Sequence, residues 1–468
     1  MPLKRAQLSL IPLVLLITGA IDSVRNLPTI ALFGPTLIFF FVISAMTFLI
    51  PVALVSAELA SVWSEEEGGI YSWVSKAFGK NWAFLTVWLQ WVNTMVWYPT
   101  ILSFIAGTLA YLTHPELAHN KGYLITVILV TFWFLTLMAL RGLKVSARFA
   151  SICAFLGMIL PMGFIIFLGI VWITKGNTLA VNLHWSTLIP KHFSPGTLVS
   201  LTAMMTSFLG MELAAVHVRD VYNPKRNFPL AVFFSVILIV CTMVMGSLAI
   251  AVVIPAKDIH LVDGVMQAFT EFFAAYHLAQ LTPLLVVLLL LGSMGSMVNW
   301  IISPAKGLLM AAQDDFLPHW FYKRNKAGVA SRVLLAQALM VTVFCSAFML
   351  FPEINMIYWL FTDLSTELYL LMYILMFLAA WRLKKTHAHL PRTFEIPGGR
   401  LGYYVVCILG LIGTGVALVV GFIPPQESMG VGGAEHFQQI FSLGLLTMIL
   451  PALLFYGHRR RVLAGPHL

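Results

Sequence analysis

Carboxylates inside long apolar stretches are the residues of this sequence whose type and position could do chemistry. Glu212 interrupts the oily segment from Met205 to Ala231, directly after Gly210 and Met211. A charged side chain in hydrocarbon costs about 2.5–3.5 kcal/mol even on a lenient insertion scale, so protein, water or a ligand must solvate it. Gly210 lets the backbone leave helical geometry without a Cβ penalty, and an unwound turn at membrane depth is tolerated where it lines a cavity. We therefore predict a broken helix facing a central site, with Glu212 as a group that binds and releases a proton.

The first apolar stretch contains a second interruption, formed by Asp22, Arg25 and Pro28. Two interpretations stay open for the charges, which are an internal Asp22–Arg25 ion pair and direct contact with a ligand. In both cases we expect the helix to break here. If Arg25 faces a cavity, its guanidinium can hold a carboxylate in bidentate fashion and favour acidic ligands.

A third set of titratable groups lies at Asp363 and Glu367, four residues apart and therefore on one helical face. Two carboxylates on one face inside an apolar run indicate a polar pathway or a proton site, and His217 adds a further titratable group. Asn93 in the third apolar run needs a polar partner. Its aromatic neighbours, Trp97 among them, are more often packing than binding residues.

Composition sets the frame for these groups. Of 468 residues, 60% are hydrophobic and 10% are charged, and the mean hydropathy is +0.90, which excludes an ordinary soluble domain. Apolar runs of about 20 residues, each long enough to cross a bilayer, recur along the chain. We predict an all-α membrane protein with about twelve transmembrane helices in a single domain, residues 1–468. The predicted spans are 8–33, 36–59, 82–112, 123–140, 147–173, 198–217, 229–254, 281–311, 332–351, 355–381, 402–423 and 436–456.

The basic residues indicate membrane topology rather than a nucleic-acid partner, although the net charge is +9. Lys4 and Arg5 precede the first span, and a run of three arginines beginning at Arg459 follows the last. Placing both termini in the cytoplasm also puts nearly every other Lys and Arg there, which is the positive-inside pattern. We expect a multi-pass protein of the plasma (inner) membrane. The four cysteines lie in apolar spans and have neither disulfide nor metal-ligand spacing, so we expect no metal.

Breaks in the first and sixth spans, five spans apart, suggest two five-helix halves related by an inverted repeat. The halves would be residues 8–173 and 198–381. Residues 402–456 would then form two additional helices.

Four motifs resemble the amino acid–polyamine–organocation superfamily of transporters, and within it the glutamate/γ-aminobutyrate antiporter branch. They are Gly210-Met-Glu212 with Asn223-Pro to Ala231, Glu58-Leu-Ala with the following Glu-Glu-Gly-Gly-Ile-Tyr-Ser-Trp-Val, Gln313-Asp-Asp-Phe-Leu-Pro318, and Arg392-Thr-Phe-Glu-Ile-Pro-Gly-Gly399. The resemblance implies an amino acid held where the first and sixth helices unwind, and transport by alternating access. It also implies a carboxylate cradle at Thr18, Gly19 and Ala20 and a gating acid at Glu212.

We expect the substrate site to include the cradle, both charges of the first break, and residues of the third and sixth spans. The full set is Thr18, Gly19, Ala20, Asp22, Arg25, Asn93, Trp97, Phe208, Gly210 and Met211, with Glu212, His217, Asp363 and Glu367 as gating or proton groups. Asp22 and Arg25 depart from the antiporter branch, which is largely uncharged at these positions.

Other classes fit less well. The sequence lacks the His-Glu-x-x-His, Gly-x-Gly-Asp and nucleotide-loop motifs of membrane enzymes, and we expect neither catalysis nor a cofactor. A channel also needs a polar pathway, but broken helices in corresponding halves favour a transporter. Proton-coupled amino acid symport stays open as the alternative to exchange.

Overall fold

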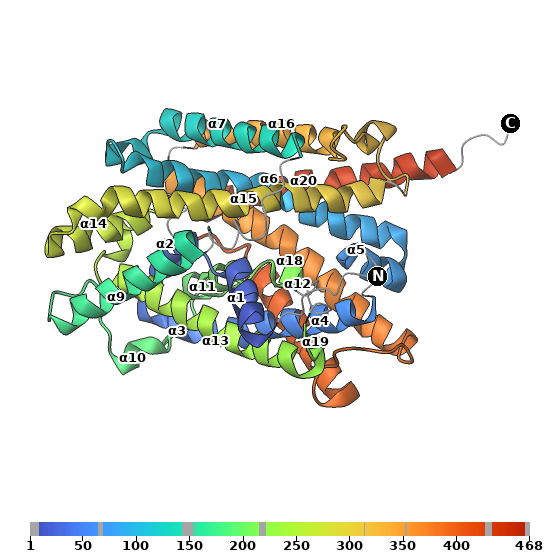
Figure 1. The fold of residues 1–468 in the computed structure, drawn as a ribbon, viewed down its shortest axis with the longest axis horizontal. Helices are drawn as coiled ribbons and strands as arrows, with labels where there is room; N and C mark the ends of the chain where they lie inside the picture. Colours follow the sequence, from blue (N-terminus) through green and yellow to red (C-terminus); the bar gives the residue numbers. More distant parts are fainter. Residues whose placement is uncertain are drawn as a thin grey trace.

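Helices make up the regular structure of this chain in the computed structural model, and Figure 1 shows the long ones side by side along the longest axis. The structure describes residues 9–63, 69–142, 153, 155–214, 221–312, 314–351, 353–425 and 433–463. No β-strand occurs in these ranges. The predicted all-α fold is therefore confirmed.

The helices follow the apolar runs closely. The first part of the chain forms α1 (Leu10–Ile21), α2 (Leu27–Ala31), α3 (Leu37–Ser44), α4 (Ile50–Val62), α5 (Ile70–Phe78), α6 (Lys80–Ala110), α7 (Lys121–Leu140) and α9 (Leu160–Thr174). The middle forms α10 (Trp185–Leu188), α11 (Pro195–Thr206), α12 (Met211–Ala214), α13 (Pro224–Ala251), α14 (Gly264–Tyr276) and α15 (Thr282–Ala312). The last part forms α16 (Ser331–Cys345), α17 (Ala347–Leu350), α18 (Ile354–Thr386), α19 (Gly399–Val420) and α20 (Gly433–Leu463).

Local sequence explains where several helices begin. The Asn120 side chain accepts a hydrogen bond from the Tyr123 amide at 3.0 Å and caps α7. Ser194 caps α11 in the same way, and Pro195 occupies the first helical position, where no amide hydrogen is needed.

Nine helical segments in the described residues are long and apolar enough to cross a membrane, or ten if the bent pair Leu10–Gly19 and Val24–Ala31 counts as one span. The polytopic membrane fold is thereby confirmed, whereas the count of twelve, the single-domain boundaries and the inverted repeat stay predictions. Two predicted spans, 82–112 and 198–217, account for the difference between the twelve predicted spans and these ten, because neither forms, within the part of the chain that the structure describes, a helix that is both long and apolar enough. α6 is long but richer in polar and aromatic residues, and α11 is a short apolar helix separated from α12 by a turn.

α6 packs against both α15 and α18, and α18 also packs against α19. The π-turn η5 (Phe155–Ile159) lies against α15 at a contact between two glycines. A Cβ on Gly292 would lie 2.6 Å from the carbonyl carbon of Gly157. Only glycine allows the two backbones to approach this closely.

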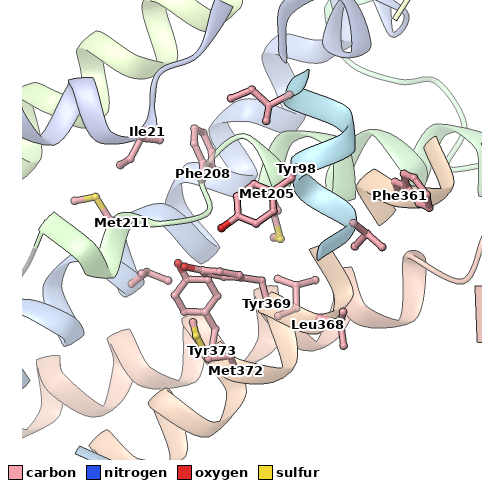
Figure 2. Packing of buried hydrophobic residues seen from close by; sticks show 14 of the residues in the cluster. Ile21, Tyr98, Met205, Phe208, Met211, Phe361, Leu368, Tyr369, Met372 and Tyr373 are labelled. Atoms are coloured by element: carbon pink, nitrogen blue, oxygen red, sulfur yellow. The ribbon is translucent and has the colours of Figure 1, made fainter. Parts of the chain in front are cut away.

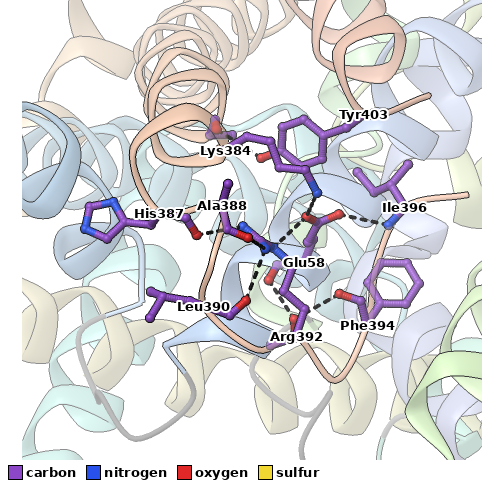
Figure 3. Close-up of polar contacts among 11 residues, drawn as sticks. Glu58, Lys384, His387, Ala388, Leu390, Arg392, Phe394, Ile396 and Tyr403 are labelled. Atoms are coloured by element: carbon purple, nitrogen blue, oxygen red, sulfur yellow. Dashed lines mark hydrogen bonds and ion pairs between the residues drawn. The ribbon is translucent and has the colours of Figure 1, made fainter. Parts of the chain in front are cut away.

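A buried ionic cluster joins α4, the end of α18 and the segment before α19 (Figure 3). Glu58 accepts hydrogen bonds from Lys384 Nζ at 2.6 Å and from the Ile396 amide at 2.8 Å, and its Oε1 lies 3.0 Å from Arg392 Nε. Two of the motifs that carried the family resemblance, at Glu58 and at Arg392, thus meet in space. Their role here is to hold the helix ends together.

Candidate functional site

The first span breaks at Asp22, as predicted. α1 ends at Ile21, and Asp22 and Ser23 adopt extended backbone geometry before the short 3₁₀ turn η1 (Val24–Asn26). Pro28 lies in the first turn of α2, a position that tolerates the missing amide hydrogen. The helical pieces on either side are bent by 44°.

The sixth span breaks at Gly210, also as predicted. α11 ends at Thr206, and Gly210 has φ +97°, in the left-handed region that favours glycine. Its amide donates a hydrogen bond to the Tyr373 hydroxyl at 3.0 Å, so a side chain of α18 satisfies a backbone group freed by the break.

A cavity of about 300 Å³ lies between the two breaks. This volume is at the lower end of the range for small-molecule sites, about 300–1,000 Å³. Its lining includes Gly19, Asp22 and Arg25 from the first break, Asn93 and Trp97 from α6, Thr206, Ser207 and Leu209 from the second break, and Ser365 and Tyr369 from α18.

Asp22 and Arg25, both buried, point to different neighbours. Asp22 Oδ2 accepts a hydrogen bond from Thr242 of α13 at 2.8 Å. Arg25 donates one to Thr100 of α6 at 2.8 Å, and its Cζ lies 5.5 Å from the centre of the Trp97 ring. The described residues contain no Asp22–Arg25 ion pair. The structure therefore does not support the interpretation in which the two charges form an internal pair. The extended backbone at Asp22 and Ser23 separates the two side chains toward opposite helices.

Each of these two charged groups keeps one buried polar atom without a hydrogen-bond partner in the protein. The atoms are Asp22 Oδ1 and Arg25 Nε. Leaving a buried charge incompletely solvated is costly, so the two residues, which both line the cavity, favour a polar ligand beside them.

Glu212 lies behind the cavity wall rather than in it. Its Oε1 accepts hydrogen bonds from Tyr369 at 2.6 Å and from Gln90 at 3.3 Å, and its Oε2 accepts one from Tyr373. Figure 2 shows Tyr369 and Tyr373 together beneath the segment that carries Phe208 and Met211. Because Tyr369 lines the cavity, one hydroxyl separates Glu212 from its interior.

The other predicted residues lie elsewhere. Thr18, Phe208, Gly210 and Met211 are buried but are not among the lining residues. The backbone of Ala20 lies in α1, and His217 lies outside the described residues.

Asp363 and Glu367 share a buried face of α18, yet they do not line the cavity. Glu367 packs against Gly421 at the end of α19, where an added Cβ would overlap its carboxylate oxygen. Asp363 Oδ2 and both Glu367 oxygens make no hydrogen bond to the protein. These two carboxylates therefore lie apart from the cavity.

Sequence reasoning missed several polar residues of the site, namely Gln90, Thr206, Ser207, Thr242, Ser365, Tyr369 and Tyr373. Serine, threonine and tyrosine are common in transmembrane helices, so they carry little signal on their own. One signal was available, since Ser365 and Tyr369 are four residues apart and share a face of α18.

Comparison with known proteins adds an independent line of evidence. The family model described as amino acid permease matches residues 8–446. An uncharacterized transporter of Legionella pneumophila is 43% identical over 420 residues, which cover 90% of each chain. A glutamate/gamma-aminobutyrate antiporter of Lactococcus lactis is 29% identical over 466 residues, 98% of this chain and 92% of that protein. A probable agmatine/putrescine antiporter of Lactococcus lactis is 26% identical over 406 residues, 83% of this chain and 84% of that protein.

Proposed function

The chain belongs to the amino acid permease family, and from this premise we propose that it exchanges amino acids across the membrane by alternating access, as an antiporter of glutamate/γ-aminobutyrate type. The motif resemblance is thereby confirmed at the level of the family. The protein is a multi-pass membrane transporter and not an enzyme. Exchange, the substrate and the cytoplasmic placement of both termini belong to the proposal.

The observation that carries the proposal is the pair of incompletely bonded charges in the cavity. An acidic amino acid brings an ammonium, which matches the Asp22 carboxylate, and a side-chain carboxylate, which matches the Arg25 guanidinium. Each buried group would then meet a group of opposite charge. Hydrogen bonds between charged groups are stronger than those between neutral groups. The amides of Thr18 to Ala20 are used inside α1, which runs from Leu10 to Ile21, so the predicted cradle is not unwound and the α-carboxylate has to bind elsewhere in the cavity.

Glu212 is proposed to couple transport to protonation through Tyr369. When Glu212 is ionised, its Oε1 accepts the Tyr369 hydrogen bond. Protonation turns one Glu212 oxygen into a donor, so the tyrosine hydroxyl at that oxygen has to accept instead of donate, and protonation at Oε1 would release the Tyr369 proton to bond elsewhere. Protonation of Glu212, which follows the second break, would thereby change the hydrogen bonding of Tyr369 in the cavity wall.

Proteoliposomes test the exchange mechanism directly. We expect uptake of labelled glutamate to be accelerated when the vesicles are loaded with unlabelled glutamate or γ-aminobutyrate. Equal uptake into loaded and empty vesicles would contradict exchange and would leave proton symport or a channel, of which the channel shows no trans effect.

Proton symport is the second candidate, and the buried carboxylates Asp363 and Glu367 are the observation that favours it. A proton site separate from the substrate cavity is what a coupled transporter needs. Substrate accumulation in empty vesicles, driven by an inward proton gradient and abolished by an uncoupler, would establish symport in place of exchange.

A further inference from the structure

A cluster of two histidines and one aspartate lies outside the cavity, at the end of the bundle that carries α14 in Figure 1. His119 ends the 3₁₀ turn η4 (Pro115–His119) between α6 and α7. His260 lies in the loop after α13, and Asp263 is the residue before α14. One potential ligand atom from each lies within 4.8 Å of the others. The two imidazole ring centres are 4.4 Å apart.

Asp263 is held in an orientation that its position in the chain does not explain. An aspartate at a helix N-cap normally accepts a hydrogen bond from an amide of the first turn, but this carboxylate makes no such bond. Instead Oδ2 accepts a hydrogen bond from the Tyr111 hydroxyl at 2.9 Å, and Oδ1 lies 3.5 Å from His260 Nδ1. The Asp263 side chain is only 2% exposed.

Neither Asp263 Oδ1 nor His260 Nδ1 has a hydrogen-bond partner. The His260 imidazole, 3.5 Å away, is the nearest charged neighbour of Asp263 Oδ1, and a cation between the two would satisfy both atoms. The cluster therefore places an unsatisfied carboxylate oxygen of Asp263 next to two imidazoles, whose nitrogens can also coordinate a metal ion.

The geometry fits a small divalent ion. Zinc bound to nitrogen and oxygen at about 2.0–2.1 Å in a tetrahedron places its ligand atoms roughly 3.3 Å apart. The His260–Asp263 distance of 3.5 Å is already close to that value. His119 has to approach more closely, and its exposed imidazole can do so by side-chain rotation.

We propose that His119, His260 and Asp263 bind a divalent transition-metal ion, zinc in the first instance, with the fourth position left to water. Two histidines and a carboxylate form a recognised zinc donor set. Tyr111 orients the carboxylate from outside the donor set, as hydrogen-bonded partners of metal ligands commonly do. No sequence motif predicts this site, because its residues come from two separate loops.

The bound ion would fasten α14 to the turn between α6 and α7. α14 begins against the first break, since a Cβ on Gly264 would lie 2.9 Å from Pro28 Cβ in α2. α6 carries Asn93 and Trp97 of the cavity wall. This step rests on the proposed function: zinc should restrain α6, a wall of the substrate site, relative to the helix that follows the first break, and should slow transport.

Binding is tested on the purified full chain in nanodiscs, freed of metal by a chelator and titrated with zinc chloride at neutral pH. We expect one zinc ion per chain and a higher melting temperature. His119→Ala should weaken zinc binding at least tenfold, whereas His114→Ala, an exposed histidine at the start of the same turn, should not. His119 is itself exposed, so its loss should leave folding intact.

Several results would overturn the proposal. These are the absence of saturable zinc binding, an equal loss of affinity in the two histidine variants, and stabilisation by acid alone, which would indicate a protonated His260 paired with Asp263. Transport is measured separately, as inhibition of wild-type uptake by zinc that His119→Ala relieves. A failed transport assay leaves the binding result standing, whereas zinc binding without inhibition would refute the restraint on the cavity walls.

Discussion

Replacing Arg25 by glutamine separates a ligand-binding role from a structural one. In the structure Arg25 lines the cavity, donates one hydrogen bond to Thr100 and lies near the Trp97 ring, while its Nε has no hydrogen-bond partner in the protein. A hydrogen bond to a charged group contributes about 1.5–3 kcal/mol. Since 1.4 kcal/mol corresponds to a factor of ten, Arg25→Gln should weaken the binding of acidic amino acids by roughly 10- to 150-fold.

The assay is competition of unlabelled amino acids against labelled substrate in proteoliposomes, for the wild type and the variant. Neutral amino acids of similar size should lose far less affinity than glutamate and aspartate. Arg25→Lys serves as the control for charge, because it keeps the cation but loses the planar fork that grips a carboxylate. Equal losses for acidic and neutral substrates would refute a side-chain role for Arg25 in selection.

The double variant Asp22→Asn with Arg25→Gln adds a second check. Partners in one buried ion pair would compensate for each other when both are removed. Because the two side chains contact different helices, we expect the double variant to lose at least as much affinity as either single variant. Rescue of transport in the double variant would instead indicate an ion pair.

Three further predictions concern protonation and packing. Glu212→Gln should flatten the dependence of transport rate on pH, and a profile identical to that of the wild type in a well-folded variant would refute a proton role. Glu58→Ala should lower the free energy of unfolding by about 3–5 kcal/mol, because it leaves Lys384 and Arg392 without their carboxylate partner. Glu395→Ala, at an exposed position in the same region, should have little effect. Gly292→Ala should destabilise the protein by about 1–3 kcal/mol, because the added Cβ would clash with the η5 backbone. Gly415→Ala is the control, since an added Cβ there meets no atom within 4 Å, and equal stability of the two variants would contradict the Gly292 contact.

Local sequence was sufficient to place the two breaks. Charges and a proline inside an apolar run located the first break, and a glycine before a carboxylate located the second. The helix boundaries also agree closely, since the run predicted at 123–140 is α7 (Lys121–Leu140) and that at 355–381 lies within α18 (Ile354–Thr386). These features depend on composition and periodicity, which are local properties of the chain.

Partners distant in sequence could not be predicted in this way. Asp22 meets Thr242, and Glu212 meets Tyr369, through the packing of helices that are far apart in the chain. Periodicity put Asp363 and Glu367 on one face of a helix, but it does not say which neighbour that face contacts. Their position against α19 instead of the cavity follows from tertiary packing alone.

The central claim is that the cavity between the two breaks binds an amino acid through Asp22. Equilibrium binding of labelled glutamate to the purified protein tests it most directly, with Asp22→Asn as the variant and Asp363→Asn, a buried carboxylate outside the cavity, as the control. The account predicts at least about a tenfold loss of affinity in Asp22→Asn and near wild-type affinity in the control. Unchanged binding in Asp22→Asn, or an equal loss in Asp363→Asn, would contradict it.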